Sequence, residues 1–352
     1  MSRNILTLHC RFSCENRRCL ARNGALKVLI LFFVIAANTA LAQDTHYSQY
    51  FNVPLSVNPA LTGKMDGTFR VGLDYRNQWF GLTNDGSTYS TPTFYADAPV
   101  RFKNKSILGV GFNLVNDRSS GGRLSNFSGM IALAYHQAMG KTKKHFLSFG
   151  LQGGLLQKKL DLANIHFGNE INPQDGSFIN GGNTVNGSGG GFDMNAGVDW
   201  SSEFSDKVSL HAGYGVYHLL QPEISFVSGT EKLPMRSVIN AEADFSLSKH
   251  FGLLPHFTYM SQAKASETYF GLTAALAFSN DVAMYLGAYY RLQDAVAPYF
   301  GLNIKGFKVG FSYDLTASDL KNTSGGIEFS LVYTGKYVPV PDVKPSLYCP
   351  RF

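Results

Sequence analysis

Five histidines are the side chains in this sequence best suited to carry chemistry. A hydrolase needs a His beside a nucleophile such as Ser, and the candidates by type are His136, His211, His218, His250 and His256. No Gly-x-Ser-x-Gly elbow, His-Glu-x-x-His pair or phosphate-binding loop occurs in the sequence. We therefore expect each histidine to have a structural or luminal role, and the sequence predicts neither an enzyme nor a cofactor.

Two aspartates are the remaining candidates for a ligand site. Asp193 and Asp199 lie six residues apart on the same face of a predicted strand, which is not a metal-ligand spacing. We therefore expect no metal there. Instead, we expect both carboxylates to form hydrogen bonds with basic side chains in a lumen, such as those of Arg70 and Arg76.

The first 42 residues have the features of a secretory signal peptide. Basic residues precede the apolar run 28–37, and Ala40-Leu41-Ala42 places small residues at the positions that a signal peptidase recognises. The apolar run is too short to span a bilayer. We expect cleavage between Ala42 and Gln43, with a retained membrane anchor as the alternative.

Removing that leader changes the meaning of the charge and cysteine content. It contains six of the 31 Lys and Arg residues and one of the 25 Asp and Glu residues, so the net charge falls from +6 to +1. The basic excess of the full chain is then no evidence for a nucleic-acid partner. Of the four cysteines only Cys349 remains, which excludes an internal disulfide framework.

Alternation of apolar and polar residues dominates the remaining sequence. Phe307, Val309 and Phe311 alternate with Lys308 and Gly310, so a strand here has one apolar and one polar face. The polar faces are rich in Gly, Ser, Asn and Thr, whereas a soluble β-sandwich would present Lys and Glu to water. Segments of about ten residues suit tilted strands that cross a bilayer. The sequence therefore predicts an all-β fold, a transmembrane antiparallel β-barrel.

We predict about 14 strands in this barrel, an even number that places both chain ends on the periplasmic side. The predicted strands are 67–77, 87–98, 106–116, 124–137, 145–157, 191–201, 207–219, 236–246, 251–261, 267–278, 282–292, 295–304, 306–315 and 325–335. The short turns collect basic residues that form either a charged periplasmic rim or an ordinary solvated surface: Arg101, Lys103, Lys105, Lys141, Lys143 and Lys144.

Two segments do not fit the barrel wall. Residues 43–66 precede the first strand and carry aromatic residues that we expect to be exposed, in a luminal plug or a periplasmic strap. Residues 336–352 contain four prolines and cannot pair as a central strand, so we expect an extended periplasmic tail. The predicted partner contacts in this tail are Tyr337, Tyr348, Cys349, Arg351 and Phe352.

Several blocks of the sequence resemble one protein family. Residues 43–51 are Gln-Asp-Thr-His-Tyr-Ser-Gln-Tyr-Phe, and residues 52–63 continue with Asn-Val-Pro-Leu-Ser-Val-Asn-Pro-Ala-Leu-Thr-Gly. Tyr75-Arg76-Asn77-Gln78-Trp79 follows, with weaker matches at 161–168, 232–235 and 349–352. Over essentially its whole mature length the chain resembles the PorP/SprF family of outer-membrane proteins associated with type IX secretion.

The resemblance implies a non-enzymatic barrel of the bacterial outer membrane. One branch of the family is linked to a periplasmic peptidoglycan-binding lipoprotein and to ring components, and the other supports secretion and surface attachment of gliding adhesins. Tyr75, Arg76, Gln78 and Trp79 would be family-motif or luminal positions. An outer-membrane porin or small-molecule transporter is the alternative function, because a barrel of about 14 strands can enclose a ligand-sized lumen.

Overall fold

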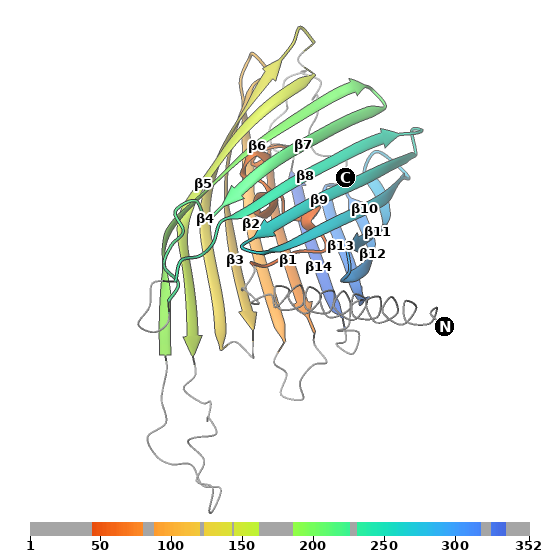
Figure 1. Ribbon diagram of the computed structural model, residues 1–352. Helices are drawn as coiled ribbons and strands as arrows, with labels where there is room; N and C mark the ends of the chain where they lie inside the picture. Colours follow the sequence, from red (N-terminus) through yellow and green to blue (C-terminus); the bar gives the residue numbers. More distant parts are fainter. Residues whose placement is uncertain are drawn as a thin grey trace, which may run out of the picture. The chain divides into compact units, whose positions relative to one another are not determined.

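Fourteen β-strands and three short helical turns make up the described part of the chain (Figure 1). The computed structural model describes residues 44–79, 88–119, 123–142, 144–161, 186–225, 231–317 and 325–335. The following predicted features lie outside these residues: the leader, its cleavage site at Ala42 and Gln43, and the tail positions Tyr337, Tyr348, Cys349, Arg351 and Phe352.

The strands form one closed antiparallel barrel in which each strand pairs with the next and β1 pairs with β14. Their bounds are β1 Phe69–Gln78, β2 Tyr89–Arg101, β3 Ile107–Ser119, β4 Leu124–Met139, β5 His145–Asp161, β6 Asn186–Ser205, β7 Val208–Tyr217, β8 Arg236–Ser246, β9 Phe251–Gln262, β10 Ala265–Ala277, β11 Val282–Arg291, β12 Ala295–Ile304, β13 Phe307–Thr316 and β14 Gly326–Gly335. Closure leaves no unpaired edge, which hydrocarbon would not tolerate.

The predicted barrel of fourteen strands is confirmed, with its largest differences in strand length at β5 and β6. Strands β5 and β6 contain 17 and 20 residues and extend beyond the predicted ends at 157 and 191. In the extension they pair with each other, from Gln157 opposite Gly190 to Asp161 opposite Asn186. Gly, Ser and Lys residues weaken the apolar alternation there. The alternation that predicts the membrane-spanning part of each strand therefore does not predict the extension.

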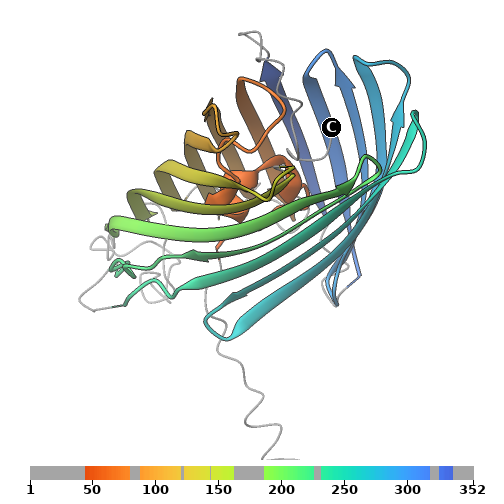
Figure 2. The same ribbon diagram turned by 90° about the horizontal axis from the view of Figure 1, so that it is seen from above.

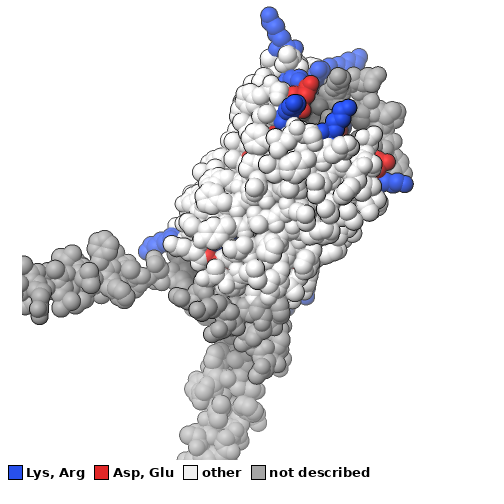
Figure 3. Space-filling model, turned by 90° about the vertical axis from the view of Figure 1, so that its right-hand side faces the viewer, with Lys and Arg blue, Asp and Glu red and all other residues white. Residues whose placement is uncertain are grey.

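The two faces of the wall differ in polarity as the alternation predicts. On β4 and β5 the side chains of Ile131, Leu133 and Leu151 are 68%, 52% and 55% exposed and point outward. Between them on the inner face lie polar side chains such as Ser148 and Gln152, which are buried. In Figure 3 the wall of the barrel is largely free of charged side chains below its upper end. Among the described residues, no helix is long and apolar enough to cross a membrane.

The two ends of the barrel differ in charge. The connections after even-numbered strands define what we call the short-turn end, at the top of Figure 1, and they contain eight Lys and two Asp residues. The connections after odd-numbered strands define the loop end and contain four Lys or Arg but seven Asp or Glu residues. Lys and Arg side chains gather at the short-turn end in Figure 3.

Replacing Leu133 by Arg tests which surface faces lipid. Leu220 is the matched control, because it is 51% exposed but lies in the connection after β7. We expect Leu133→Arg to lower the free energy of unfolding by about 2–4 kcal/mol, since a charge would enter hydrocarbon. Leu220→Arg should change it by less than about 0.5 kcal/mol. Urea unfolding in lipid vesicles measures both values, and equal effects would show that Leu133 does not face the bilayer core.

Candidate functional site

Residues 44–64 fold back into the lumen of the barrel and form what we call the plug (Figure 2). Three short turns build it: η1 Tyr50–Asn52, α2 Pro54–Val57 and η2 Pro59–Leu61. Prolines begin α2 and η2, where a fixed φ favours a helical turn and no N–H needs a partner. Leu55 and Ala60 have no exposed surface at all, so the plug is packed on every side at these residues.

The plug contacts each of the fourteen described strands. Eleven of the contacts named below are hydrogen bonds, and the three named for β10, β11 and β12 are aromatic. One contacting wall residue from each strand, in order from β1 to β14, is Arg76, Tyr95, Asn113, His136, Gln152, Asp199, Tyr217, Asn240, Gln262, Tyr269, Tyr289, Tyr299, Ser312 and Glu328. The plug therefore fills the cross-section of the lumen rather than lining one side of it.

A buried ion cluster holds the first turn of the plug where the barrel closes. Arg76 lies 2.6 Å from a carboxylate oxygen of Asp314 and 2.9 Å from one of Glu328. The backbone N–H groups of Ser48 and Gln49 donate to the same Glu328 carboxylate at 2.8 and 2.7 Å. Three strands and the plug are thus joined through one arginine and two carboxylates.

A second polar anchor lies across the lumen. Asn58 donates from its side-chain amide to the carbonyl oxygen of Val198 at 3.1 Å and to Asn240 at 3.2 Å. At the end of the plug the ammonium of Lys64 pairs with the buried carboxylate of Asp199. A buried charge without its partner destabilises a protein by several kcal/mol. Losing the polar partners at either end of the plug would therefore be strongly destabilising.

Glycines on the wall give the plug room to approach the strands. Gly150 on β5 is paired directly with Gly197 on β6, and both face the lumen. A Cβ at Gly150 would lie 2.3 Å from the backbone nitrogen of Ala60, and one at Gly197 would lie 2.0 Å from the side-chain oxygen of Asn58. The wall is therefore shaped to fit the backbone of the plug.

The predicted pairing with a basic luminal side chain is confirmed for Asp199, whose partner is Lys64, but Arg70 and Arg76 are not the partners of Asp193 or Asp199. Arg70 pairs with Asp97 on the adjacent strand, and Arg76 pairs with Asp314 and Glu328. Strand β1 neighbours β2 and β14, so its side chains find their partners there rather than on β6, which lies farther round the barrel. Asp199 pairs with Lys64 of the plug, and Asp193 pairs with His218.

Four of the five histidines lie inside the barrel, and each contacts polar groups of the wall or the plug. His136 bonds Ser148 and the backbone oxygen of Thr62, while His211 and His256 lie beside the carboxylate of Glu242. His250 lies instead in the exposed turn after β8. The described residues contain no group of three or more His, Cys, Asp or Glu side chains that would hold a metal ion.

His218 resembles a catalytic histidine most closely, yet both of its ring nitrogens are occupied. Nδ1 lies 2.6 Å from Asp193 and Nε2 lies 2.5 Å from Asp44 of the plug. Because both neighbours are carboxylates, both nitrogens act as donors and neither is left to accept a proton from a nucleophile. The arrangement ties the plug to the connection after β7.

The family-motif residues separate onto different surfaces. Arg76 lies in the lumen, but Tyr75 is 47% exposed on the outer wall, so it is not luminal. Gln78 ends β1, and the backbone N–H of Trp79 donates to Gly325 while its ring packs edge-on against Tyr89. Alternation along a strand puts neighbouring residues on opposite faces, so one motif serves both surfaces.

The aromatic side chains of the plug are buried, whereas the sequence predicted that they are exposed. Tyr47 and Tyr50 are both 5% exposed, and Tyr50 packs edge-on against Tyr269 and Tyr289 with ring centroids 5.8 and 6.0 Å apart. The wall of a closed barrel surrounds the segment on all sides and buries these rings. A run of aromatic and proline residues does not by itself reveal this environment.

Replacing Gly150 by Val should displace the plug, because the side chain would overlap the backbone of Pro59 and Ala60. We expect faster hydrogen exchange across residues 44–64 and a higher conductance in planar bilayers. Gly252→Val is the control, since the nearest atom to a Cβ there is 3.5 Å away. Unchanged exchange in Gly150→Val, or an equal increase in Gly252→Val, would contradict a plug fitted against the β5–β6 wall.

The contact between Asp44 and His218 should make stability depend on pH. Burial alone opposes the charged form of His218, but Asp44 and Asp193 outweigh it and raise the pKa of His218 above 6.5. Burial likewise opposes ionisation of Asp44, yet His218 and then Arg236 bring the pKa of Asp44 well below 3.8. The contribution of His218 to the free energy of unfolding is complete below pH 6.5 and is lost as the pH rises through the raised pKa of His218. The contribution of Asp44 to the free energy of unfolding is complete above pH 3.8 and is lost as the pH falls through the lowered pKa of Asp44.

We therefore expect the urea midpoint of the native protein to fall as the pH rises above 6.5. His218→Asn should reduce that fall, because Asn removes the titrating group but tolerates the φ of 60° found at this position. The charged groups facing His218 are Asp44, Asp193 and Arg236. The same fall in both proteins would show that His218 does not cause it.

The comparisons with known proteins agree with this architecture. The toluene transporter TbuX of Ralstonia pickettii has a TM-score of 0.52 at 12% identity, over 82% of this chain and 94% of that one. The monoaromatic hydrocarbon channel CymD has a TM-score of 0.53 at 13% identity, over 81% of this chain and 93% of that one. At such identities the likeness shows a common barrel fold.

No curated protein matches the sequence significantly. The sequence model of one family, described as type IX secretion system membrane protein PorP/SprF, matches residues 39–333. That match covers most of the chain, including the plug and nearly all of the barrel. The protein therefore belongs to the PorP/SprF family of type IX secretion system membrane proteins and is located in the outer membrane.

Proposed function

We propose that this protein is a closed, non-enzymatic platform that anchors secretion or gliding machinery at the periplasmic face of the outer membrane. The observation that carries the proposal is the plug, one segment bound to all fourteen strands. Family membership supports a role in type IX secretion. A role in secretion and surface attachment of cargo adhesins would use the same closed barrel.

The closed lumen favours a platform over a porin. A porin needs a water-filled path along the barrel axis. Here Val53, Leu55 and Ala60, in the middle of the plug, are at most 1% exposed, so water does not reach them from either end. The solved transporters share the fold, and fold alone does not imply function.

The lysine rim at the short-turn end supports the proposal that the partner is an acidic periplasmic protein. We define this rim by residues of five short turns: Lys103, Lys105, Lys141, Lys144, Lys207, Lys249 and Lys305. Short turns lie on the periplasmic side in outer-membrane barrels. Of the predicted rim residues, Arg101 instead donates to the backbone oxygens of Met65 and Gly67. Lys143 lies outside the described residues. A surface with eight Lys and two Asp in its turns attracts an acidic periplasmic protein.

Reversing the charge of the rim tests the proposal. The triple variant Lys103→Glu, Lys141→Glu and Lys249→Glu changes three exposed residues at the short-turn end. The matched control, Lys159→Glu, Lys232→Glu and Lys264→Glu, changes three exposed residues at or beside the loop end. At equal abundance of folded barrel, we expect the first variant alone to lose periplasmic type IX components in pull-downs from gently solubilised outer membranes and to reduce cargo secretion.

Two results would contradict the platform. One is full secretion and normal recovery of type IX components with the reversed rim. The other is a steady conductance of the wild-type protein in planar bilayers that small solutes block, because this would support the porin or transporter instead.

A further inference from the structure

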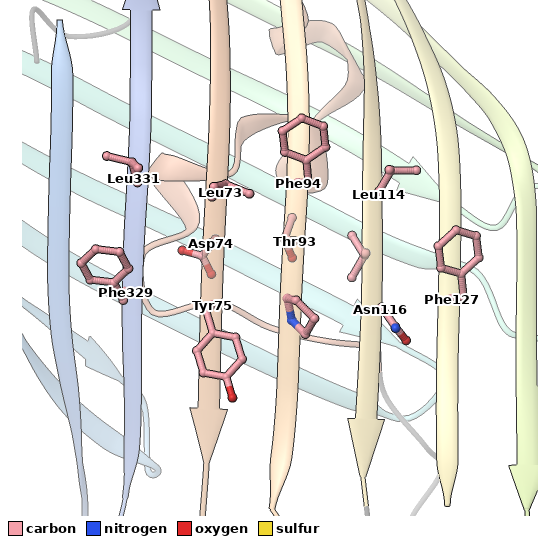
Figure 4. Close-up of a pocket in the computed structure, with 12 residues that line it drawn as sticks. Leu73, Asp74, Tyr75, Thr93, Phe94, Leu114, Asn116, Phe127, Phe329 and Leu331 are labelled. Carbon is pink, nitrogen blue, oxygen red and sulfur yellow. The ribbon is translucent and has the colours of Figure 1, made fainter. Parts of the chain in front are cut away.

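The outer wall of the barrel contains an apolar hollow of about 380 Å³ that spans β14 to β4 (Figure 4). Large side chains line it, among them Leu73, Tyr75, Phe94, Leu114 and Phe127. Pro92 on β2 also lines it. Leu73, Tyr75, Leu114 and Phe127 are 38–50% exposed and point away from the lumen. We call this feature the Pro92 groove.

The groove lies where a proline interrupts the pairing of the wall. Strands β2 and β3 pair at Ser90 with Arg118 and again, in the same register, at Thr93 with Val115, but Thr91 and Pro92 between them form no pair with β3. Pro92 has no N–H to donate to β3, and proline is uncommon in central strands for this reason. Pro92 is exposed and lies opposite Tyr75 on β1, and its small ring among larger lining side chains leaves a depression in the surface.

Polar side chains lie at the loop end of the groove. Asn116 and Arg118 follow Leu114 on the outward face of β3, and Ser125 lies opposite Arg118 on β4. With the Asn116 amide nitrogen turned toward Ser125, its oxygen accepts from Nε and Nη2 of Arg118 at 3.1 and 2.9 Å. A guanidinium has five N–H donors, so the exposed Arg118 retains donors for an anion.

We infer that the Pro92 groove binds one acyl chain of a membrane lipid, with the lipid phosphate on Arg118. The groove opens on the face of the barrel that meets hydrocarbon, where an acyl chain is the abundant apolar occupant. An arginine just beyond an apolar groove matches the order of chain and phosphate in a lipid, and guanidinium binds phosphate through paired hydrogen bonds. This lipid site is independent of the proposed periplasmic anchoring.

Native mass spectrometry of the purified protein in detergent tests the site with defined lipids. The probes are palmitoyl-oleoyl-phosphatidylglycerol, lipid A, and dioleoylglycerol, which has acyl chains but no phosphate. We expect the wild-type protein to retain one lipid and to prefer the two phosphate-bearing probes. The probe retained more strongly then identifies the source of the phosphate.

Two groove-filling variants and one headgroup variant distinguish the site from general lipid adhesion. Pro92→Phe or Leu114→Trp should reduce retention about tenfold or more, because burying even two methylene groups is worth about that factor. Leu133→Phe adds bulk elsewhere on the outer wall and should change nothing. Arg118→Gln should abolish the preference for phosphate while dioleoylglycerol binds as before. Heat-modifiable migration in gels confirms that each variant is folded.

Three results would overturn the inference. The first is wild-type retention no greater than that of both folded groove-filling variants. The second is an equal loss in Leu133→Phe. The third is an Arg118→Gln protein that still prefers phosphate. A wild-type protein that retains no lipid at all is an extreme case of the first result.

Discussion

The structure depends on one constraint: a barrel wall in hydrocarbon must pair its backbone polar groups between strands and turn most of its polar side chains toward the lumen. The strands satisfy this constraint for the backbone by closing β1 onto β14. They satisfy it for side chains by turning Arg76, Asp199 and Glu328 inward, where each is at most 2% exposed. Buried charges need partners, and the plug supplies many of them through Lys64, Ser48 and the backbone of Gln49. The plug is therefore part of the folded barrel.

Because side chains along a strand alternate between the lumen and the outer wall, neighbouring residues contribute to different surfaces. Arg76 joins the ion cluster that holds the plug, while Tyr75 borders the Pro92 groove on the outside. A short sequence motif thus couples the closure of the lumen to the shape of the lipid-facing wall. The charge of the two barrel ends adds a third surface, because the short turns are basic and the opposite loops are acidic.

Clusters of His and acidic residues in this lumen resemble catalytic arrangements but lack their geometry. A general base needs a ring nitrogen free to accept a proton from a nucleophile. His218 instead lies between two carboxylates, and one of the nitrogens of His136 contacts the backbone oxygen of Thr62. These histidines join the plug to the wall. Polar residues gather in the lumen because they cannot face lipid, so their clustering is weak evidence for catalysis.

The sequence by itself indicated about 14 strands in an antiparallel barrel and the apolar and polar faces of most of them, because alternation with period two is a local property of a strand. It also indicated the family. It did not determine the extension of β5 and β6, the burial of Tyr50 or the partners of Asp193 and Asp199. Only the tertiary structure decided these, because barrel closure brings together residues as distant as Arg76 and Glu328, and the plug reaches all fourteen strands at once. Such contacts depend on the whole ring, and no local spacing encodes them.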